Sequence, residues 1–299
     1  MADAGAAALL GPRTVVLTGA GLSTDSGIPD YRGPGAPVRM PMTFQDFVAS
    51  ADNQRRYWAR AHVGWSRMGS AEPNAGHRAL ARLEAAGEVS FLITQNVDGL
   101  HERAGQRRMV ALHGRVSDVV CLDCGGTTGR HAMQHRLTEA NPGWLEEHGL
   151  ALARPDGDVE LEETTRFVVP ACPGCGGRLK PHVVFFGENV PKERVARCYA
   201  ALDAADALLV AGSSLTVMSG LRFVRYAAKA GLPVVIVNRG VTRGDDLATL
   251  KIEAGCSEWL TELAGPGPLR KSRSDCLEGS GLGDEDVLGR LGHDLGRLA

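Results

Sequence analysis

The chain has 299 residues, of which 43% are hydrophobic and 23% are charged, and this apolar content is sufficient for a folded core in one large domain or two. The formal net charge of −2, together with the lack of any Lys/Arg-dense run, argues against nucleic acid as a partner. No apolar stretch approaches the roughly 20 residues that cross a bilayer, so we expect no association with a membrane.

The first predicted element is a strand at residues 13–18, an apolar run that leads into the glycine-rich loop 18–32. Gly19 and Gly21 lack side chains where a backbone could approach a pyrophosphate, as in dinucleotide-binding loops. Thr24 stands where the third glycine of the G-x-G-x-x-G pattern would be, so the loop does not match that of hydride-transferring enzymes. We instead expect a loop that closes over a nucleotide.

Further strand-like runs at 89–94, 207–212 and 233–238 alternate with helical patterns, listed in chain order as 43–68, 73–87, 97–104, 189–204 and 217–230. This alternation predicts an α/β fold with a Rossmann-like parallel sheet and helices on both faces. Loops that follow parallel strands meet at the carboxyl edge of the sheet, where open α/β sheets bind ligands. Four polar motifs occupy such loops, which supports a nucleotide site.

Two insertions interrupt the alternation and define the predicted domains. Residues 1–114 and 184–264 are predicted to form a discontinuous, Rossmann-like nucleotide-binding domain, with a small helical insertion at about 33–72 that carries three prolines. Residues 115–183 form a smaller zinc-binding module with a long insert at 125–171. From residue 265 to 299 the composition changes to Gly/Pro-rich and then charged sequence, which predicts a disordered tail.

The zinc prediction depends on two C-x-x-C pairs, Cys121/Cys124 and Cys172/Cys175, each of which is followed by two glycines. Such knuckles let two thiolates reach one tetrahedral ion, and the glycines permit the tight turn. A redox disulfide is the alternative for a single pair, but two similar knuckles favour one structural ion with no catalytic water. We expect the isolated Cys198 to pack in the core.

Five further motifs follow the glycine loop in a fixed order: Thr94–His101, Leu112–Gly114, Lys180–Glu188, Gly212–Leu215 and Ile236–Asn238. Together with the cysteine pairs, this set resembles the sirtuin family of NAD-dependent protein deacylases over roughly residues 12–264. Finer motifs, Arg55–Arg60, Gly64-Trp65 and Asp245–Ala248, resemble class II sirtuins, the branch that includes a mitochondrial lipoamidase and ADP-ribosyltransferase.

The resemblance implies a reaction in which an acyl-lysine attacks the nicotinamide ribose of NAD, nicotinamide leaves, and a general base then activates a ribose hydroxyl. His113 matches the family's base, and Asn96 is its catalytic partner at the ribose. Residues implied in NAD binding are Gly19, Ala20, Gly21, Asp30, Tyr31, Arg32, Gln95, Asn96, Asp98, Gly212, Ser213, Ser214, Asn238 and Cys256. Structural alternatives remain: His113 in the core, Asp98 as a helix cap and Arg32 in a surface ion pair.

Val184, Phe185, Phe186 and Gly187 are expected to line the acyl-lysine channel and to offer backbone to an extended peptide. Tyr57 and Arg60, three residues apart, share a helix face, and a Tyr/Arg pair of this kind holds the substrate carboxylate in sirtuins that remove acidic acyl groups. A solvated helix surface is the equally open alternative for this pair.

The leading functional hypothesis is therefore an NAD-dependent protein-lysine deacylase, with NAD and one Zn²⁺ as cofactors and acylated lysine as partner. A mono-ADP-ribosyltransferase that uses the same site and a non-catalytic sensor of NAD or ADP-ribose are the alternatives. Residues 1–10 lack the patterns of signal and transit peptides, so we expect a cytoplasmic protein, and a monomeric one.

Overall fold

The computed structural model describes residues 4–30, 41–148, 161 and 163–265. All of these described residues belong to one compact unit. The predicted tail, apart from residue 265, lies outside the described residues, as do Tyr31, Arg32 and part of the insert at 125–171. Among the helices that are described, none is both long and apolar enough to span a membrane.

The main sheet has six strands, in the spatial order β3-β2-β1-β7-β8-β9, and each strand is parallel to its neighbours. Its strands are β1 (Thr14–Thr18), β2 (Val89–Thr94), β3 (Met109–Ala111), β7 (Ala207–Ala211), β8 (Val234–Val237) and β9 (Leu250–Ile252). All four predicted strands are thus present. The strand order runs outward in both directions from the boundary between β1 and β7, and α/β sheets form ligand crevices at such a point.

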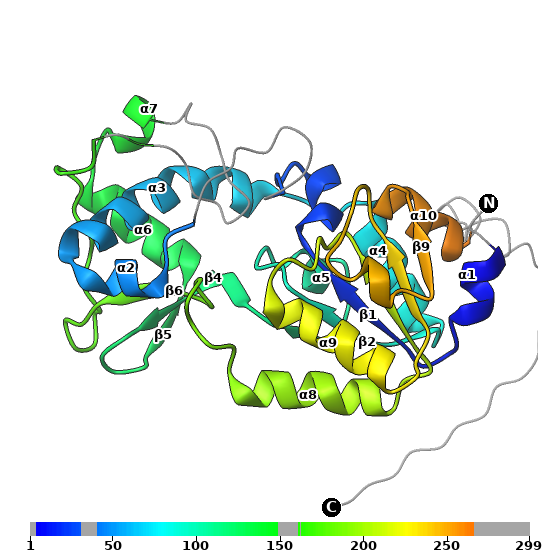
Figure 1. The fold of residues 1–299 in the computed structure, drawn as a ribbon. Coiled ribbons are helices and arrows are strands. Elements are labelled where there is room, and N and C mark those ends of the chain that lie inside the picture. Colours follow the sequence, from blue (N-terminus) through cyan, green and yellow to red (C-terminus); the bar gives the residue numbers. More distant parts are fainter. Residues whose placement is uncertain (1–3, 31–40, 149–160, 162, 266–299) are drawn as a thin grey trace, which may run out of the picture. The chain divides into compact units, whose positions relative to one another are not determined.

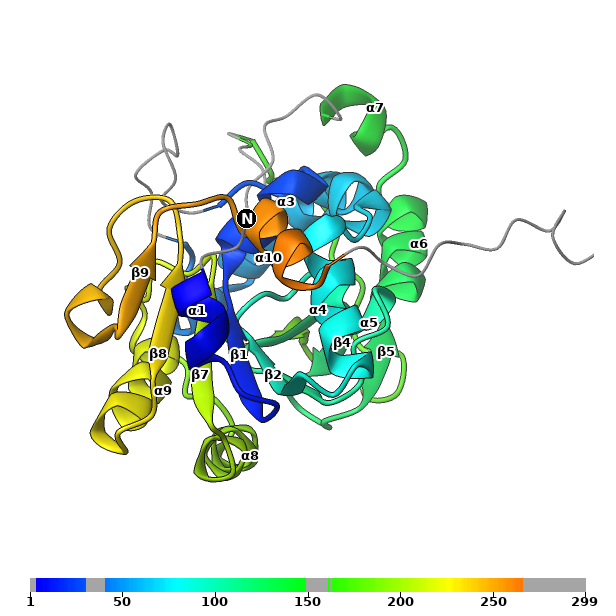
Figure 2. The ribbon, with the colours of Figure 1, turned by 90° about the vertical axis from the view of Figure 1, so that its right-hand side faces the viewer.

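Helices cover both faces of this sheet, as Figures 1 and 2 show. One face packs against α1 (Ala4–Leu9), α4 (Ala75–Ala85) and α10 (Cys256–Leu263). The other packs against α8 (Lys192–Asp203) and α9 (Met218–Lys229). Successive strand residues alternate between the two cores: Val16 belongs to the first, while Val15 and Leu17 belong to the second. The predicted Rossmann-like fold class is confirmed.

A second, antiparallel sheet forms the smaller module, with strands β4 (Gly114–Cys121), β5 (Thr127–Gly129) and β6 (Leu179–Val183) in the order β5-β4-β6. The helices α6 (Arg130–Ala140) and α7 (Trp144–His148) belong to the same module. They share one apolar core with the helical insertion: Trp58, Val119 and Met133 are all fully buried in it.

The helical pattern predicted at 43–68 forms two helices, α2 (Phe44–Ala49) and α3 (Ala51–Ser70). Ser50 between them has an extended backbone, and its side chain accepts a hydrogen bond from the Asn53 N–H, which caps α3. A short helix, α5 (Leu100–Arg103), occupies the predicted range 97–104. Residues 95–98 before it are therefore free to shape a loop.

Candidate functional site

A cavity of about 1100 Å³ lies at the carboxyl edge of the main sheet. Loops from all six strands contribute to its wall, including β3, which ends just before His113, and β9, which ends just before Glu253. The predicted site residues that border it are Gly19, Ala20, Gly21, Asp30, Tyr57, Gln95, Asn96, Asp98, His113, Val184, Phe185, Phe186, Gly187, Gly212, Ser213, Ser214 and Asn238. The structure therefore brings residues more than 200 positions apart to one cavity.

The two glycine-containing loops of the cavity pack backbone against backbone. A Cβ atom at Gly21 would lie 2.9 Å from the carbonyl oxygen of Gly212, and one at Gly19 would lie 2.8 Å from the Cβ of Ser213. Gly212 has φ +67°, and a Cβ there would lie 2.4 Å from the Leu22 nitrogen. The Gly21 N–H donates to the Gly212 carbonyl at 2.9 Å. These glycines are needed first for the contact between the loops, which forms one continuous wall.

His113 is held by two hydrogen bonds. Its Nδ1 lies 2.8 Å from the backbone oxygen of Gln95, and its Nε2 lies 2.8 Å from Oγ of Ser219. Because a carbonyl oxygen can only accept, Nδ1 carries the hydrogen and Nε2 holds the lone pair. Burial lowers the pKa of His113, the hydrogen bond to the Gln95 carbonyl opposes this shift, and the charge of Arg194 adds to it. The net shift is downward and favours the neutral ring.

The turn that presents His113 depends on Gly114. Gly114 has φ +83°, and a Cβ atom at this position would lie only 2.1 Å from the carbonyl oxygen of His182 on β6. The His113 carbonyl in turn accepts the N–H of Val184 at 2.8 Å. The predicted Leu112–Gly114 motif is thus the crossing point between the main sheet and the smaller module.

Asn96 and Asp98 converge on Ser23. The Ser23 hydroxyl donates to Oδ2 of Asp98 at 2.7 Å, and Nδ2 of Asn96 lies 3.0 Å from the same hydroxyl oxygen. Oδ1 of Asp98 also accepts the N–H of Leu100 at 2.9 Å, so the capping alternative is present beside the cavity position. Burial raises the pKa of Asp98, which makes it a candidate for a functional carboxyl group.

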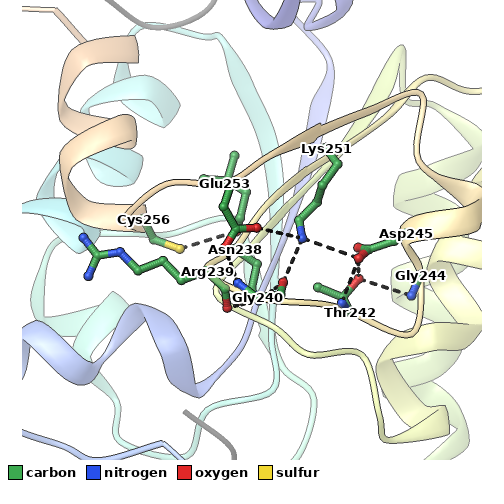
Figure 3. Close-up of polar contacts among 10 residues, drawn as sticks. Asn238, Arg239, Gly240, Thr242, Gly244, Asp245, Lys251, Glu253 and Cys256 are labelled. Atoms are coloured by element: carbon green, nitrogen blue, oxygen red, sulfur yellow. Dashed lines mark hydrogen bonds and ion pairs between the residues drawn. The ribbon is translucent and has the colours of Figure 1, made fainter. Parts of the chain in front are cut away.

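The far end of the cavity is formed by the loops after β8 and β9, which Figure 3 shows side by side. Lys251 joins them: its Nζ donates to the Gly240 carbonyl at 2.8 Å and lies 3.6 Å from Oε2 of Glu253. Glu253 accepts the N–H of Gly240. Nδ2 of Asn238 donates to the carbonyls of Arg239 and Gly240. This end is polar and held in one shape by its own contacts.

The segment from Val183 to Glu188 forms the opposite wall. The Phe186 carbonyl accepts the N–H of Phe44 at 2.9 Å, which joins this segment to α2. Phe186 remains 37% exposed, whereas Phe185 and Tyr57 are buried, with ring centroids 5.2 Å apart. The segment therefore forms a largely apolar wall of the cavity, and its role in binding an acyl-lysine stays a prediction.

Some predicted residues lie elsewhere. Cys256 is buried beside the cavity end and donates its thiol to the Val237 carbonyl at 3.5 Å, but it does not border the cavity. Arg60 is half-buried on α3 and also does not border it. Tyr31 and Arg32 lie outside the described residues. Ser23, Ser219 and Glu253 also border the cavity, although none of them was predicted as a site residue from the sequence.

The four predicted zinc ligands lie together. Their Sγ atoms are all within 4.8 Å of one another, with Cys121 and Cys175 3.6 Å apart and Cys124 and Cys172 3.9 Å apart. A zinc ion with Zn–S bonds of about 2.3 Å would place tetrahedral sulfurs about 3.8 Å apart, so the donor set fits this ion.

Both knuckles have the same backbone pattern. The N–H of Gly125 donates to the Cys121 carbonyl, and the N–H of Gly176 donates to the Cys172 carbonyl. These glycines have φ +72° and +74°, as the tight turn requires. Cys198, in contrast, is fully buried in the core, as predicted.

The fold and the cavity define a Rossmann-type nucleotide-binding protein with a four-cysteine zinc module. Residues 19–219 match the Sir2 family. The chain is 56% identical to "NAD-dependent protein deacetylase 1" of Mycobacterium avium over 86% of this chain and 93% of that protein. It is 54% identical to "NAD-dependent protein deacetylase" of Bordetella bronchiseptica over 84% and 92%. The chain belongs to the Sir2 family, the sirtuins.

Solved structures agree with this assignment. One described as Sir2 with a p53 peptide and NAD⁺ superposes with a TM-score of 0.67 and 33% identity, over 84% of this chain and 91% of that one. Another, described as Sir2 bound to an acetylated peptide, gives a TM-score of 0.66 with 31% identity, over 84% of this chain and 91% of that one. The family implies NAD as the cofactor, and the four cysteines fit one structural zinc ion.

Proposed function

We propose that the protein is an NAD-dependent protein-lysine deacylase that transfers the acyl group to ADP-ribose and releases nicotinamide. The observation that carries this proposal is the position of His113: it borders the cavity, with Nδ1 bonded to the Gln95 carbonyl and Nε2 bonded to the hydroxyl of Ser219, which also borders the cavity. A pure sensor of NAD would need no base at this place. Relatives with more than half of their residues identical are named as deacetylases, which agrees with this chemistry.

The proposed roles follow from the walls of the cavity. NAD supplies the leaving nicotinamide and the reactive ribose carbon, and the residues of the chain bind and orient it. With NAD bound, His113 would accept a proton from a ribose hydroxyl at Nε2, and Asn96 would orient the ribose. Asp98 and Ser23 would face the nicotinamide amide, the loops at Gly19–Gly21 and Gly212–Ser214 would hold the phosphates, and Asn238 would bind the adenosine ribose. All of these residues border the cavity.

We also propose that the protein belongs to the class II branch and prefers acidic or long acyl groups over acetyl. The motifs at Arg55–Arg60 and Asp245–Ala248 and the length of the insert at 125–171 support this branch. Tyr57 borders the cavity and supports a role in acyl selection, whereas Arg60 would have to turn toward it. Arg60 would bind an acyl carboxylate by charge-assisted hydrogen bonds, worth ~1.5–3 kcal/mol.

The test is to incubate the protein with NAD and peptides that carry acetyl, lipoyl, succinyl or glutaryl lysine, and to follow nicotinamide and peptide mass together. Loss of acyl mass with equal nicotinamide release is the expected result. Nicotinamide release with a gain of ADP-ribose mass would instead identify a mono-ADP-ribosyltransferase. An Arg60→Met variant should lose any preference for acidic chains. A wild type that favours acetyl over every acidic chain contradicts the proposed preference.

The cytoplasmic location and the monomeric state remain proposals that have their own tests. Fractionation of cells that produce the protein would test the first. Sedimentation of the purified zinc-loaded protein would test the second. A membrane fraction or a concentration-dependent dimer would contradict them.

A further inference from the structure

Ser219 is the only residue among those the structure describes that is recorded in a hydrogen bond to Nε2 of His113, at 2.8 Å. It is the second residue of α9, it is 9% exposed, and it borders the cavity. Since Nδ1 carries the ring hydrogen toward Gln95, the hydroxyl of Ser219 must donate to the lone pair of Nε2. The hydroxyl therefore occupies the hydrogen-bond position that a substrate hydroxyl would need.

The contact is fixed by the packing of α9 on Gln95. Gly220 follows Ser219, and a Cβ atom there would lie 2.6 Å from Nε2 of Gln95, so a larger residue would push the Gln95 amide aside. The Gln95 side chain is itself held, because its Oε1 accepts the hydroxyl of Ser213 at 2.6 Å. The Gln95 N–H donates to the Thr18 carbonyl at 2.9 Å. Gln95 therefore supports both contacts of the His113 ring. Its own carbonyl binds Nδ1, and its side chain packs against the helix that carries Ser219.

We propose that Ser219 is a positioning residue for His113: its hydroxyl holds the imidazole with Nε2 directed toward the ribose-binding part of the cavity, and it gives up the Nε2 lone pair to the ribose hydroxyl only at the proton-transfer step. This inference rests on the proposed function of His113 as the base. A ring tethered only at Nδ1 could rotate about that hydrogen bond and move Nε2 away from the substrate hydroxyl. Displacement of a catalytic group by about 1 Å can cost roughly a hundredfold in rate.

The surroundings leave this role to Ser219. The charged group that acts on His113 is Arg194 of α8, whose guanidinium donates to the Leu112 carbonyl at 3.4 Å. This guanidinium is directed to the backbone of Leu112, whereas the contact of Nε2 is with Ser219. Asp98 is the predicted site carboxylate closest to His113 in the sequence. Its two oxygens already accept hydrogen bonds from the Ser23 hydroxyl and from the Leu100 N–H.

The experiment compares Ser219→Ala, Ser219→Thr and, as a matched control, Ser70→Ala. Ser70 ends α3, is exposed, and donates its hydroxyl only within its own helix. Two activities are measured with NAD and an acylated peptide: exchange of labelled nicotinamide into NAD, which precedes the base, and acyl transfer, which needs it. Ser219→Ala should lose about 10- to 100-fold in kcat for acyl transfer, with exchange and the KM for NAD unchanged.

Ser219→Thr keeps a hydroxyl and should recover most of the rate, while Ser70→Ala should behave as wild type. A parallel loss of exchange and transfer in Ser219→Ala would mean a merely structural role and would overturn the proposal, as would a wild-type kcat. A second measurement needs no substrate: the ¹⁵N resonance of His113 Nε2 should shift in Ser219→Ala and not in the control. An unshifted resonance overturns the role proposed for Ser219, whatever reaction the enzyme catalyses. A shifted resonance in a protein whose wild type transfers no acyl group would instead reject only the proposed deacylase function.

Discussion

Glu188→Gln removes the negative charge from a partly buried ion pair beside the predicted acyl-lysine channel. Nζ of Lys180 lies 2.9 Å from Oε2 of Glu188 and donates to the Val183 carbonyl at 2.5 Å. The same Oε2 accepts the N–H of Phe185 at 2.7 Å. The ammonium also lies 4.6 Å from the centroid of the Phe185 ring. The pair therefore ties together both ends of the segment that forms one cavity wall.

The expected cost can be worked from burial. The Lys180 side chain is 5% exposed and that of Glu188 is 23% exposed, so the cation has little access to water once the carboxylate is gone. Burial already lowers the pKa of Lys180, and Glu188 opposes that shift. Removing one partner of a buried pair costs ~3–5 kcal/mol, and the amide keeps the shape and part of the hydrogen bonding. We expect the free energy of unfolding to fall by about 3 kcal/mol.

The assay is urea unfolding of the zinc-loaded protein for Glu188→Gln, Lys180→Met and the double variant. The double variant should be less destabilised than the sum of the single ones, because it leaves no unpaired charge. In steady-state kinetics, the KM for acylated peptide should rise while the KM for NAD stays constant, since the pair supports the wall near Val184 and Phe185. A loss under about 1 kcal/mol, as for surface pairs, or strict additivity would refute the reasoning.

Three other outcomes are expected. Cys172→Ser should lose metal and stability together, because binding of structural zinc is part of the folding free energy, and an unchanged zinc content would contradict the site. His113→Ala should lose ~10²–10⁴-fold in acyl transfer with NAD affinity preserved, and unchanged turnover would reject His113 as the base. Burial lowers the pKa of His77 from 6.5 to about 4, so its neutral ring contributes stability that is lost as the pH falls from 6.5 toward 4. The free energy of unfolding, measured in urea, should therefore fall between about pH 7 and pH 5 by about 2 kcal/mol less in His77→Gln than in wild type. An equal fall in both proteins would contradict this.

The main elements of the fold were predictable because each carries a local signal. The runs at 89–94 and 207–212 are apolar and long enough to identify buried strands, and they coincide with β2 and β7. The strands β3 and β9 have three residues each, too few for any period to appear. They form because β2 and β8 offer them a parallel neighbour, as the pairs Ile93 with Val110 and Ile236 with Lys251 show. Such pairing depends on the tertiary structure and leaves no local pattern in the sequence.

The same limit applies to the site. Gly19, Gln95, Asn96 and Gly212 stand in motifs directly after strands, so the sequence predicted that they would meet at one edge of the sheet. Ser219 stands inside a helix, 106 positions from His113, and a single serine there carries no signal. Glu253 follows a strand that was not predicted. Arg60 illustrates the reverse case, because helical spacing from Tyr57 put both residues on one face but could not say which of them reaches the cavity.

The sequence motif and the observed contacts indicate different roles for Gln95. As a motif residue it is predicted to contact ribose, but its polar groups are already engaged: the backbone oxygen by His113, the side-chain oxygen by Ser213 and the N–H by Thr18. A ribose hydroxyl can therefore meet the Gln95 amide through its nitrogen or through the second lone pair of its oxygen. The base, the phosphate loop after β7 and the loop after β1 are thus joined through one residue, so binding at any of them bears on the orientation of His113.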